Sequence, residues 1–424
     1  MKKSEFFFKA EFLVTIILLI FAACSKNDNP GPSPVITGFS PSSGLVGSSV
    51  AIYGDHFIPA VPPEKGVGPF ANTSIVAFNG TVAEAEYIYQ DSIGKQHIYP
   101  KVPAGATTGK ITVTANGKTV SSLDDFNVTV PIYLPNVEVT TVPGRGAEDV
   151  AVDGEGSLYV TYKDSYNIVK ITPDGNLHTL WSSATGEIPY GIAVDAKGNV
   201  FATVLGSYIL KIDAGGKVST LVGSAESGDV DGQGTSARFN FPFGIALDKD
   251  GNLYVADYFN YKIRKITPDG IVSTLAGSTQ GFKDGTGTNA QFRSPMDVAM
   301  DGEGNVYVTD GNHIRKVTSD GQVSTVAGSS TPGYLDGTTV NARFSDLSGI
   351  VIDSADNLYV CDEYVVRIIA PDGTVATVAG STPGNVDGPG SSAQFYYLLG
   401  ITMDAGGAIY LAQSDGPIRK IVIH

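Results

Sequence analysis

Cysteine, histidine, tryptophan and cationic side chains are scarce in this sequence of 424 residues. Two cysteines are too few for a disulfide framework or a zinc–thiolate centre, and the five histidines show no paired spacing. The 28 lysines and arginines are outnumbered by 43 aspartates and glutamates, which gives a net charge of −15. Because binding to a phosphate backbone needs clustered cations, this balance excludes nucleic acid as the expected partner.

The apolar run near the N-terminus is too short to cross a membrane. Leu13–Ala23 has 11 residues, whereas a spanning helix needs about 20. We therefore interpret residues 1–23 as a signal peptide. The motif Phe21-Ala22-Ala23-Cys24 resembles a bacterial lipobox, and this resemblance implies lipid attachment at Cys24. An ordinary secretory signal cut at the same place is the alternative.

Residues 24–33 are polar at first and then rich in proline and glycine. This segment resembles the tether of surface-exposed lipoproteins of Gram-negative bacteria. The resemblance implies a lipid-anchored protein of the outer membrane that faces the cell surface. Its contact with the membrane would be made through the anchor alone.

Glycine is abundant, with 51 residues and no collagen period, and 20 tyrosines and 19 phenylalanines accompany it. This composition is typical of short strands joined by glycine turns and predicts an all-β protein. Residues 34–130 alternate between apolar and polar positions, with turn residues about every ten positions, which predicts a β-sandwich. The segment resembles the immunoglobulin-like IPT/TIG family, whose members serve as spacers or binding modules. Residues 131–136 are the predicted linker.

Residues 137–424 contain an internal repeat. Asp248–Asp257 recurs as Asp301–Asp310 and Asp353–Asp362, and looser copies begin at Asp153, Asp195 and Asp404. Six copies of four short strands predict a six-bladed β-propeller, and the details resemble the NHL-repeat family. The last copy ends after its third strand, while Val137–Gly144 matches the fourth-strand pattern. We therefore expect Val139 to pair beside Ile418–Ile423 and close the ring.

Residues that recur from blade to blade are interpreted as scaffold, because one ligand seldom needs the same contact four times. The connections between blades carry Asp-Gly pairs that are predicted turns, followed by a phenylalanine that packs the loop onto the blades. Repeated calcium sites are the alternative for the aspartates. Arginines in the third strands recur likewise. The recurring residues are Asp231, Asp284, Asp336 and Asp387; Phe239, Phe292, Phe344 and Phe395; and Arg264, Arg315, Arg367 and Arg419.

Residues that do not recur are the better candidates for a binding site. The connections between blades and the loops between second and third strands share one face, and aromatic residues gather there. Such rings combine apolar area with a polar group, which suits sugar or peptide recognition, although packing between loops is the alternative. The candidate ligand-binding residues are Tyr258, Phe259, Tyr261, Phe282, Tyr334, Tyr364, Tyr396 and Tyr397, and Tyr162, Tyr166, Tyr190 and Tyr208 extend the enrichment.

Two aspartates are predicted to face the central channel. The residue just before the first strand is glycine in four blades but Asp149 and Asp297 in the opposite blades 1 and 4. Two carboxylates could hold a divalent cation such as calcium or bind a cationic group, whereas aspartate is also a familiar alternative at this position in NHL-type repeats. Asp149 and Asp297 are therefore candidate metal ligands.

The sequence carries no catalytic constellation that we can argue from spacing. Cys361 replaces Ala256 and Thr309 of sibling blades, which indicates a small buried residue rather than a nucleophile. We expect a non-catalytic protein that binds an extracellular glycan or protein on the long-loop face, most plausibly a glycan in nutrient uptake. A lyase or a calcium-dependent hydrolase or lactonase is the first alternative, and a scaffold of the cell envelope is the second.

Overall fold

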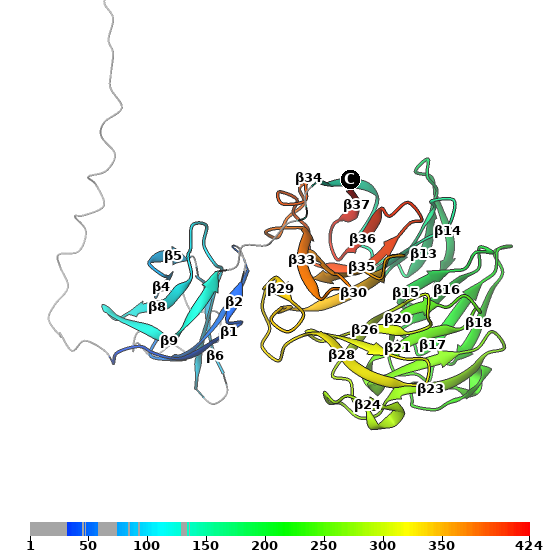
Figure 1. Cartoon of the computed structure of the whole chain (residues 1–424), viewed down its shortest axis with the longest axis horizontal. Helices are drawn as coiled ribbons and strands as arrows, with labels where there is room; N and C mark the ends of the chain where they lie inside the picture. The colour runs from blue at the N-terminus through cyan, green and yellow to red at the C-terminus, as the bar shows by residue number, and fades with distance from the viewer. Residues whose placement is uncertain are drawn as a thin grey trace, which may run out of the picture.

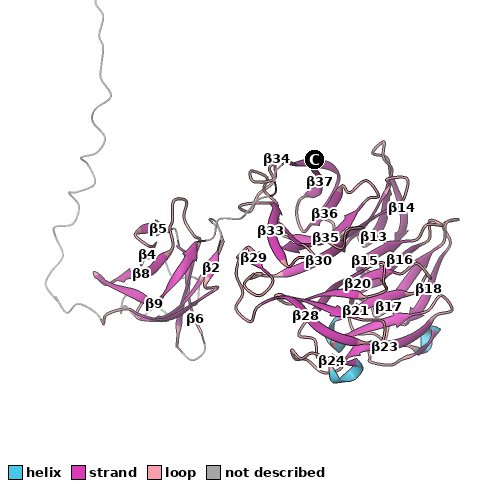
Figure 2. Cartoon of the chain, in the orientation of Figure 1, coloured by secondary structure: helices cyan, strands magenta, loops and turns pink. Residues whose placement is uncertain are grey.

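The computed structural model describes residues 32–44, 46, 48–57, 74–83, 85–91, 94–128, 134 and 136–424. The predicted signal peptide and the lipid attachment at Cys24 lie outside these residues. Figure 1 shows a small β-domain followed by a larger ring of sheets, and Figure 2 shows that strands dominate both. The described helices are three 3₁₀ turns, η1 (Gly234–Ser236), η2 (Tyr258–Asn260) and η3 (Gly287–Asn289), and none of them could cross a bilayer.

The N-terminal domain is a sandwich of two sheets, as predicted. One sheet has the order β1 (Val35–Ser40), β3 (Ala51–Asp55), β7 (Gln96–Pro100), β6 (Ala85–Gln90). The other has the order β2 (Ser43–Gly44), β9 (Lys118–Val128), β8 (Gly109–Ala115), β4 (Ile75–Phe78), β5 (Thr81–Ala83). Alternate residues such as Ile111 and Val113 of β8 are fully buried and pack with Ile52, Ile98 and Phe126 between the sheets. Period-two alternation in the sequence therefore encodes the core.

Residues 137–424 form six sheets arranged in a ring. The first four sheets contain β11 (Asp149–Val152), β12 (Leu158–Tyr162), β13 (Asn167–Ile171) and β14 (Leu177–Ser182); β15 (Pro189–Val194), β16 (Val200–Val204), β17 (Tyr208–Ile212) and β18 (Val218–Gly223); β20 (Pro242–Leu247), β21 (Leu253–Asp257), β22 (Lys262–Ile266) and β23 (Ile271–Gly277); and β25 (Pro295–Met300), β26 (Val306–Asp310), β27 (His313–Val317) and β28 (Gln322–Gly328). The last two contain β30 (Leu347–Ile352), β31 (Leu358–Asp362), β32 (Val365–Ile369) and β33 (Thr374–Ala379); and β35 (Leu398–Met403), β36 (Ile409–Gln413), β37 (Pro417–Ile423) and β10 (Val137–Arg145). Each innermost strand contacts the next, and β35 contacts β11. We number these sheets blades 1 to 6.

The predicted closure of the ring is confirmed. Strand β10 pairs antiparallel with β37, and Val139 lies opposite Ile421. Both side chains are fully buried in the cluster that joins the last two blades. The first strand of the propeller segment therefore completes its last sheet, which removes an exposed edge from blade 6.

The first aspartate of each repeat builds the turn between the first and second strands. The Asp248 carboxylate accepts hydrogen bonds from the backbone N–H groups of Asp250 and Asn252 at 2.9 and 2.8 Å. Gly251 follows with a φ of 82°, a left-handed conformation that favours glycine. The motif recurs because each blade needs this tight turn, which lies on the face opposite the long loops.

The predicted Asp-Gly turns are wrong in detail. Each glycine begins a two-residue strand that pairs with the outermost strand of the following blade: β19 (Gly232–Gln233) on β23, β24 (Gly285–Thr286) on β28, β29 (Gly337–Thr338) on β33 and β34 (Gly388–Pro389) on β10. The connection crosses the outer edge of the next sheet before it returns to the channel. Asp231 stands just before β19, where its carboxylate accepts hydrogen bonds from Thr274 of β23.

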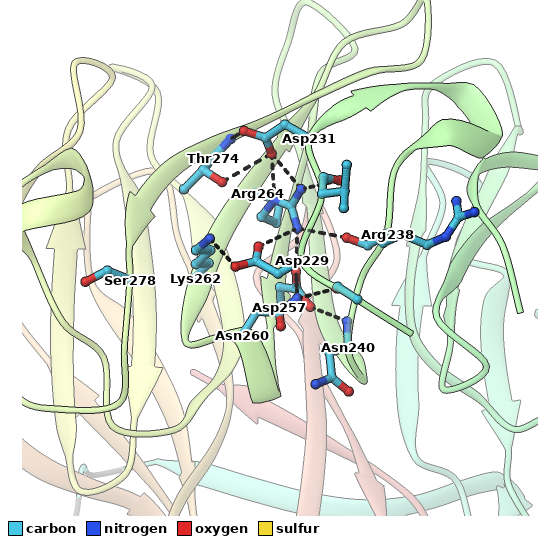
Figure 3. Close-up of polar contacts among 12 residues, drawn as sticks. Asp229, Asp231, Arg238, Asn240, Asp257, Asn260, Lys262, Arg264, Thr274 and Ser278 are labelled. Carbon is cyan, nitrogen blue, oxygen red and sulfur yellow. Dashed lines mark hydrogen bonds and ion pairs between the residues drawn. The ribbon is translucent and has the colours of Figure 1, made fainter. Parts of the chain in front are cut away.

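The recurring arginine and phenylalanine form a buried network, as their interpretation as scaffold predicted. Arg264 is fully buried and donates to Asp257 and Asp231 at 2.6 Å each (Figure 3). Its guanidinium lies over the Phe239 ring, 5.0 Å from the centroid. Arg315 and Arg367 make equivalent aspartate pairs, and Arg419 makes one with Asp387. Asp231 and its counterparts are thus partners of the arginines.

Candidate functional site

A cavity of about 480 Å³ opens on the long-loop face beside the mouth of the channel. This volume lies within the range of roughly 300–1,000 Å³ that is typical of ligand pockets. The loops between second and third strands and the ends of the connections between blades supply its walls. The lining residues are Tyr190, Leu205, Phe241, Phe243, Tyr258, Phe259, Ser294, Met296, Gly311, Asp346, Leu347 and Tyr397.

Five of the aromatic rings form a continuous series along the cavity. Tyr190 stacks on Phe243 with 4.4 Å between ring centroids, and Phe243 lies 4.6 Å from Tyr258. Phe259 continues the series at 4.9 Å from Tyr258, and Phe241 ends it at 5.1 Å from Phe259. Phe259 and Phe241 are 46% and 39% exposed, so the outer end of the series offers apolar surface to a ligand.

The buried arginine network positions the loops that carry these rings. Asp257, which pairs with Arg264, also accepts a hydrogen bond from the backbone N–H of Asn240 at 2.7 Å. Phe241 follows in a left-handed conformation with a φ of 54°, which is rare for a bulky residue. Its carbonyl accepts from the Tyr258 N–H at 3.3 Å. The recurring residues therefore hold the non-recurring ones in place.

Threonines on second strands fix the inner end of the aromatic series. The Thr161 hydroxyl of blade 1 donates to the Tyr190 carbonyl of blade 2 at 2.5 Å. Thr203 of blade 2 donates in the same way to the Phe243 carbonyl of blade 3 at 2.7 Å. These hydrogen bonds join neighbouring blades and hold the backbone that carries the stacked pair Tyr190 and Phe243.

Asp346 is the one charged side chain among the lining residues. The Tyr397 hydroxyl donates to Asp346 Oδ2 at 2.5 Å. The backbone N–H of Asp346 donates to Asp362 of the Arg367 network at 3.0 Å. Burial, and then the charge of Asp346, raise the pKa of Tyr397. Burial likewise raises the pKa of Tyr190 and of Tyr258. All three phenols are therefore neutral hydrogen-bonding groups at physiological pH.

The structure distributes the eight candidate aromatic residues over different environments. Tyr258, Phe259 and Tyr397 line the cavity, and so does Tyr190 from the extended set. The other five lie outside its lining. Tyr261 follows η2 in a left-handed conformation, and Phe282 packs against His313 and Arg315. Tyr334 is buried against Val365. Tyr364 makes an edge contact with Tyr397, and Tyr396 is exposed.

Phe241, Phe243, Met296 and Asp346 line the cavity without having been predicted. A signal for the two phenylalanines was present, because Phe241 lies just before β20 and Phe243 lies within it, at positions where the segments entering blades 4, 5 and 6 carry other residues. The same test of non-recurrence that selected the loop tyrosines would have selected them. Asp346 stands at the same position of its connection as Phe241, two residues after the recurring phenylalanine, so the same test would have selected it as well. Its contact with Tyr397 of the next blade could not be predicted from spacing.

Asp149 and Asp297 connect neighbouring blades at the wall of the channel. The two oxygens of Asp297 accept hydrogen bonds from the N–H groups of Val298 at 2.8 Å and of Ile350, in the next blade, at 2.9 Å. Asp149 makes the same two contacts with Val150 and Ile192. Burial raises the pKa of Asp297 to about 7; burial, and then the charge of Asp297, raise that of Asp149.

These contacts are those of a structural link between blades. Calcium takes six to eight oxygen ligands, as a rough rule. Among the described residues, no group of three or more histidine, cysteine, aspartate or glutamate side chains is placed to hold a metal ion. A cation between the two aspartates stays a prediction.

Nucleophilic chemistry finds little support in the described residues around the cavity. Cys361 is fully buried, and burial raises the pKa of its thiol. Ser294 is the one lining residue with an alkyl hydroxyl, and no histidine, lysine or arginine lines the cavity. The nearby His313 is buried, and its pKa is lowered to about 4 by that burial and by neighbouring arginines.

The fold and the cavity define a two-domain all-β protein with an N-terminal sandwich and a six-bladed propeller. Residues 34–128 match the model of the IPT/TIG domain. The chain is 31% identical over 278 residues to NHL repeat-containing protein 2 of Gallus gallus, covering 55% of this chain and 38% of that protein. It is 28% identical over 220 residues to Teneurin-3 of Mus musculus, covering 44% of this chain and 8% of that protein. The chain thus spans well under half of the length of these relatives.

Solved structures share this fold over most of the chain. A protein of unknown function from Bacteroides thetaiotaomicron aligns with a TM-score of 0.55 and 20% identity, over 93% of this chain and 99% of that one. An auxiliary nutrient binding protein from the same organism aligns with a TM-score of 0.53 and 18% identity, over 93% and 98%. A protein of the same description from Bacteroides ovatus also has a TM-score of 0.53, with 18% identity over 93% and 99%. At these identities the likeness shows the fold.

Proposed function

We propose that this protein is a lipid-anchored binding protein of the cell surface that captures an extracellular glycan in nutrient uptake. The series of five aromatic rings beside the channel is the observation that carries the proposal. Aromatic rings that are partly exposed at one end of the cavity suit the apolar faces of sugar rings, while the neutral phenols and Asp346 offer hydrogen bonds to hydroxyl groups.

The domain arrangement supports the same proposal. Two of the similar structures are described as auxiliary nutrient binding proteins, and their likeness extends over the sandwich and the propeller together. In the proposed arrangement Cys24 carries the lipid, residues 24–33 form the tether, and the sandwich spaces the propeller from the outer membrane. The cavity then faces the medium.

Affinity gels and a glycan array, with the intact protein, test this function. We expect Phe259→Ala to weaken binding by about 1–3 kcal/mol if this ring is a binding hot spot. Tyr396→Ala is the matched control, because Tyr396 is exposed to a similar degree on the same face but does not line the cavity. Equal losses in both variants would place the site elsewhere.

The same preparation discriminates the competing functions. Turnover of a ligand would favour a lyase or hydrolase, and its loss with Asp149→Asn or Asp297→Asn would place the chemistry at the channel. Recovery of envelope proteins by the propeller, without binding to any glycan, would favour a scaffold. Either result would contradict the proposed function.

A further inference from the structure

The charged side chains in and around the cavity indicate which kind of ligand it favours. Of its twelve lining residues, Asp346 alone bears a charge, and none is lysine, arginine or histidine. Asp346 is exposed, and only one of its oxygens has a partner among the described residues, namely Oδ2, which accepts from Tyr397. The other oxygen, Oδ1, is free to accept a hydrogen bond from a ligand.

The surroundings add to the negative potential at this point. The charges that raise the pKa of Tyr190 belong chiefly to Glu148, Asp149 and Asp297, and Asp346 acts in the same direction on Tyr258. Lys163, the cation beside Glu148, is paired with it at 2.8 Å. Arg293 precedes the lining residue Ser294 but is not itself part of the lining. The net charge of the whole chain, −15, is also negative.

Aromatic faces and a carboxylate are complementary to a cation. The negative face of an aromatic ring attracts an ammonium group within about 6 Å of its centroid. A carboxylate adds a charge-assisted hydrogen bond, which is about twice as strong as a neutral one. Tyr258 contributes both to the aromatic series and to the surroundings of Asp346, so one ligand could contact the two features together.

We infer that the cavity selects glycans that carry free, protonated amino groups, with Asp346 accepting the ammonium hydrogen bond while the Tyr258–Phe259 end of the aromatic series contacts the sugar ring. The inference rests on the proposed function and names the substrate class of the same site. Tyr397 is a positioning residue, because its hydroxyl holds the carboxylate through Oδ2 and leaves Oδ1 available to a ligand.

Three oligosaccharides of equal length test the inference by calorimetry with the full chain. Hexaglucosamine is cationic at mildly acidic pH, hexa-N-acetylglucosamine is neutral, and hexagalacturonate is anionic. We expect hexaglucosamine to bind most tightly, and its advantage over the acetylated form to shrink as salt is added. Asp346→Asn, which keeps the shape of the side chain, should weaken binding of hexaglucosamine by about tenfold to hundredfold and leave the acetylated form unchanged.

Asp164→Asn is the matched control, since Asp164 is an exposed carboxylate in a loop of blade 1 on the same face but outside the lining. An equal loss in that variant would reduce the effect to the overall charge and overturn the inference. Equal affinity for the three oligosaccharides, or a preference for hexagalacturonate, would also overturn it while glycan binding stands. Binding of none of them, with binding of another glycan on the array, would overturn the inference alone. Binding of no glycan at all would overturn the proposed function as well.

Discussion

Gly244 lies where any side chain would collide with the carboxylate of Asp297 in the next blade. A Cβ atom at Gly244 would stand 2.0 Å from Asp297 Oδ1 and 2.5 Å from its Cα. Gly400 stands in the same relation to Asp149, at 2.1 Å from Oδ1. Each aspartate can therefore occupy the wall of the channel only because the preceding blade provides a glycine. This pairing of glycine and aspartate occurs at two places in the ring.

This contact predicts the effect of a single methyl group. Gly244→Ala should lower the free energy of unfolding by about 1–3 kcal/mol or more, because backbone atoms as well as the carboxylate must move. Gly302→Ala is the control: nothing lies within 4 Å of the added Cβ, and its backbone is not left-handed. Urea denaturation measures both, and equal stability of the two variants would contradict the close packing.

The buried network predicts a larger loss. Arg264→Met should destabilise the protein by about 3–5 kcal/mol, because it leaves the fully buried Asp257 without its cation. Arg293→Met, which replaces an exposed arginine, should change stability by no more than about 0.5 kcal/mol. Adding Asp257→Asn to Arg264→Met should restore part of the loss in thermal or urea unfolding. A loss in the double variant equal to the sum of the single ones would show that the two residues act independently.

The buried acids predict that stability decreases as the pH rises toward neutrality. Burial raises the pKa of Asp297 to about 7 and that of Asp257 and Asp362 to about 6. Between the ordinary aspartate pKa of 3.8 and these values, the folded state binds more protons than the unfolded state. Each acid therefore lowers the free energy of unfolding as pH rises, by at most about 1.4 kcal/mol per pH unit. His313 acts oppositely between 6.5 and about 4, since its pKa is lowered.

Asp297→Asn isolates one of these groups. We expect the variant to show a flatter dependence of the free energy of unfolding on pH between about pH 4 and pH 7 than the unmodified protein. Denaturant titrations at several pH values measure the two slopes. Identical slopes would mean that Asp297 does not titrate in this window.

The anchor predicts a change in fractionation. Cys24→Ala should release the protein from membranes, whereas Cys361→Ala should leave it there, because Cys361 is buried in blade 5. Detergent partitioning of both variants measures this, with intact-cell proteolysis to report which side of the membrane is exposed. Retention of the Cys24→Ala variant in the membrane fraction would refute the lipid attachment.

Sequence periodicity predicted the sandwich, the sheets of the propeller and their closure, because strand alternation and the Asp248-type turns are local properties. It also separated Arg264 and Phe239 from the candidate site, because they recur. It did not show that Asp231 pairs with Arg264, since that contact depends on a connection that crosses the edge of the next sheet. It did not predict the contact of Asp346 with Tyr397, or that Tyr261 and Phe282 lie outside the lining of the cavity, because the direction of a loop residue depends on neighbouring blades.

The closure of the ring by β10 has a consequence for biogenesis. Val139 and Ile421 lie at opposite ends of the propeller segment, so β10 lacks its partner in blade 6 until the C-terminal strand β37 has been synthesised. The sandwich needs no residue beyond Val128 for its two sheets and can fold earlier. A chain whose synthesis stops before β37 would carry a finished sandwich and an open propeller, whose unpaired strand β10 would be available to proteases and to aggregation.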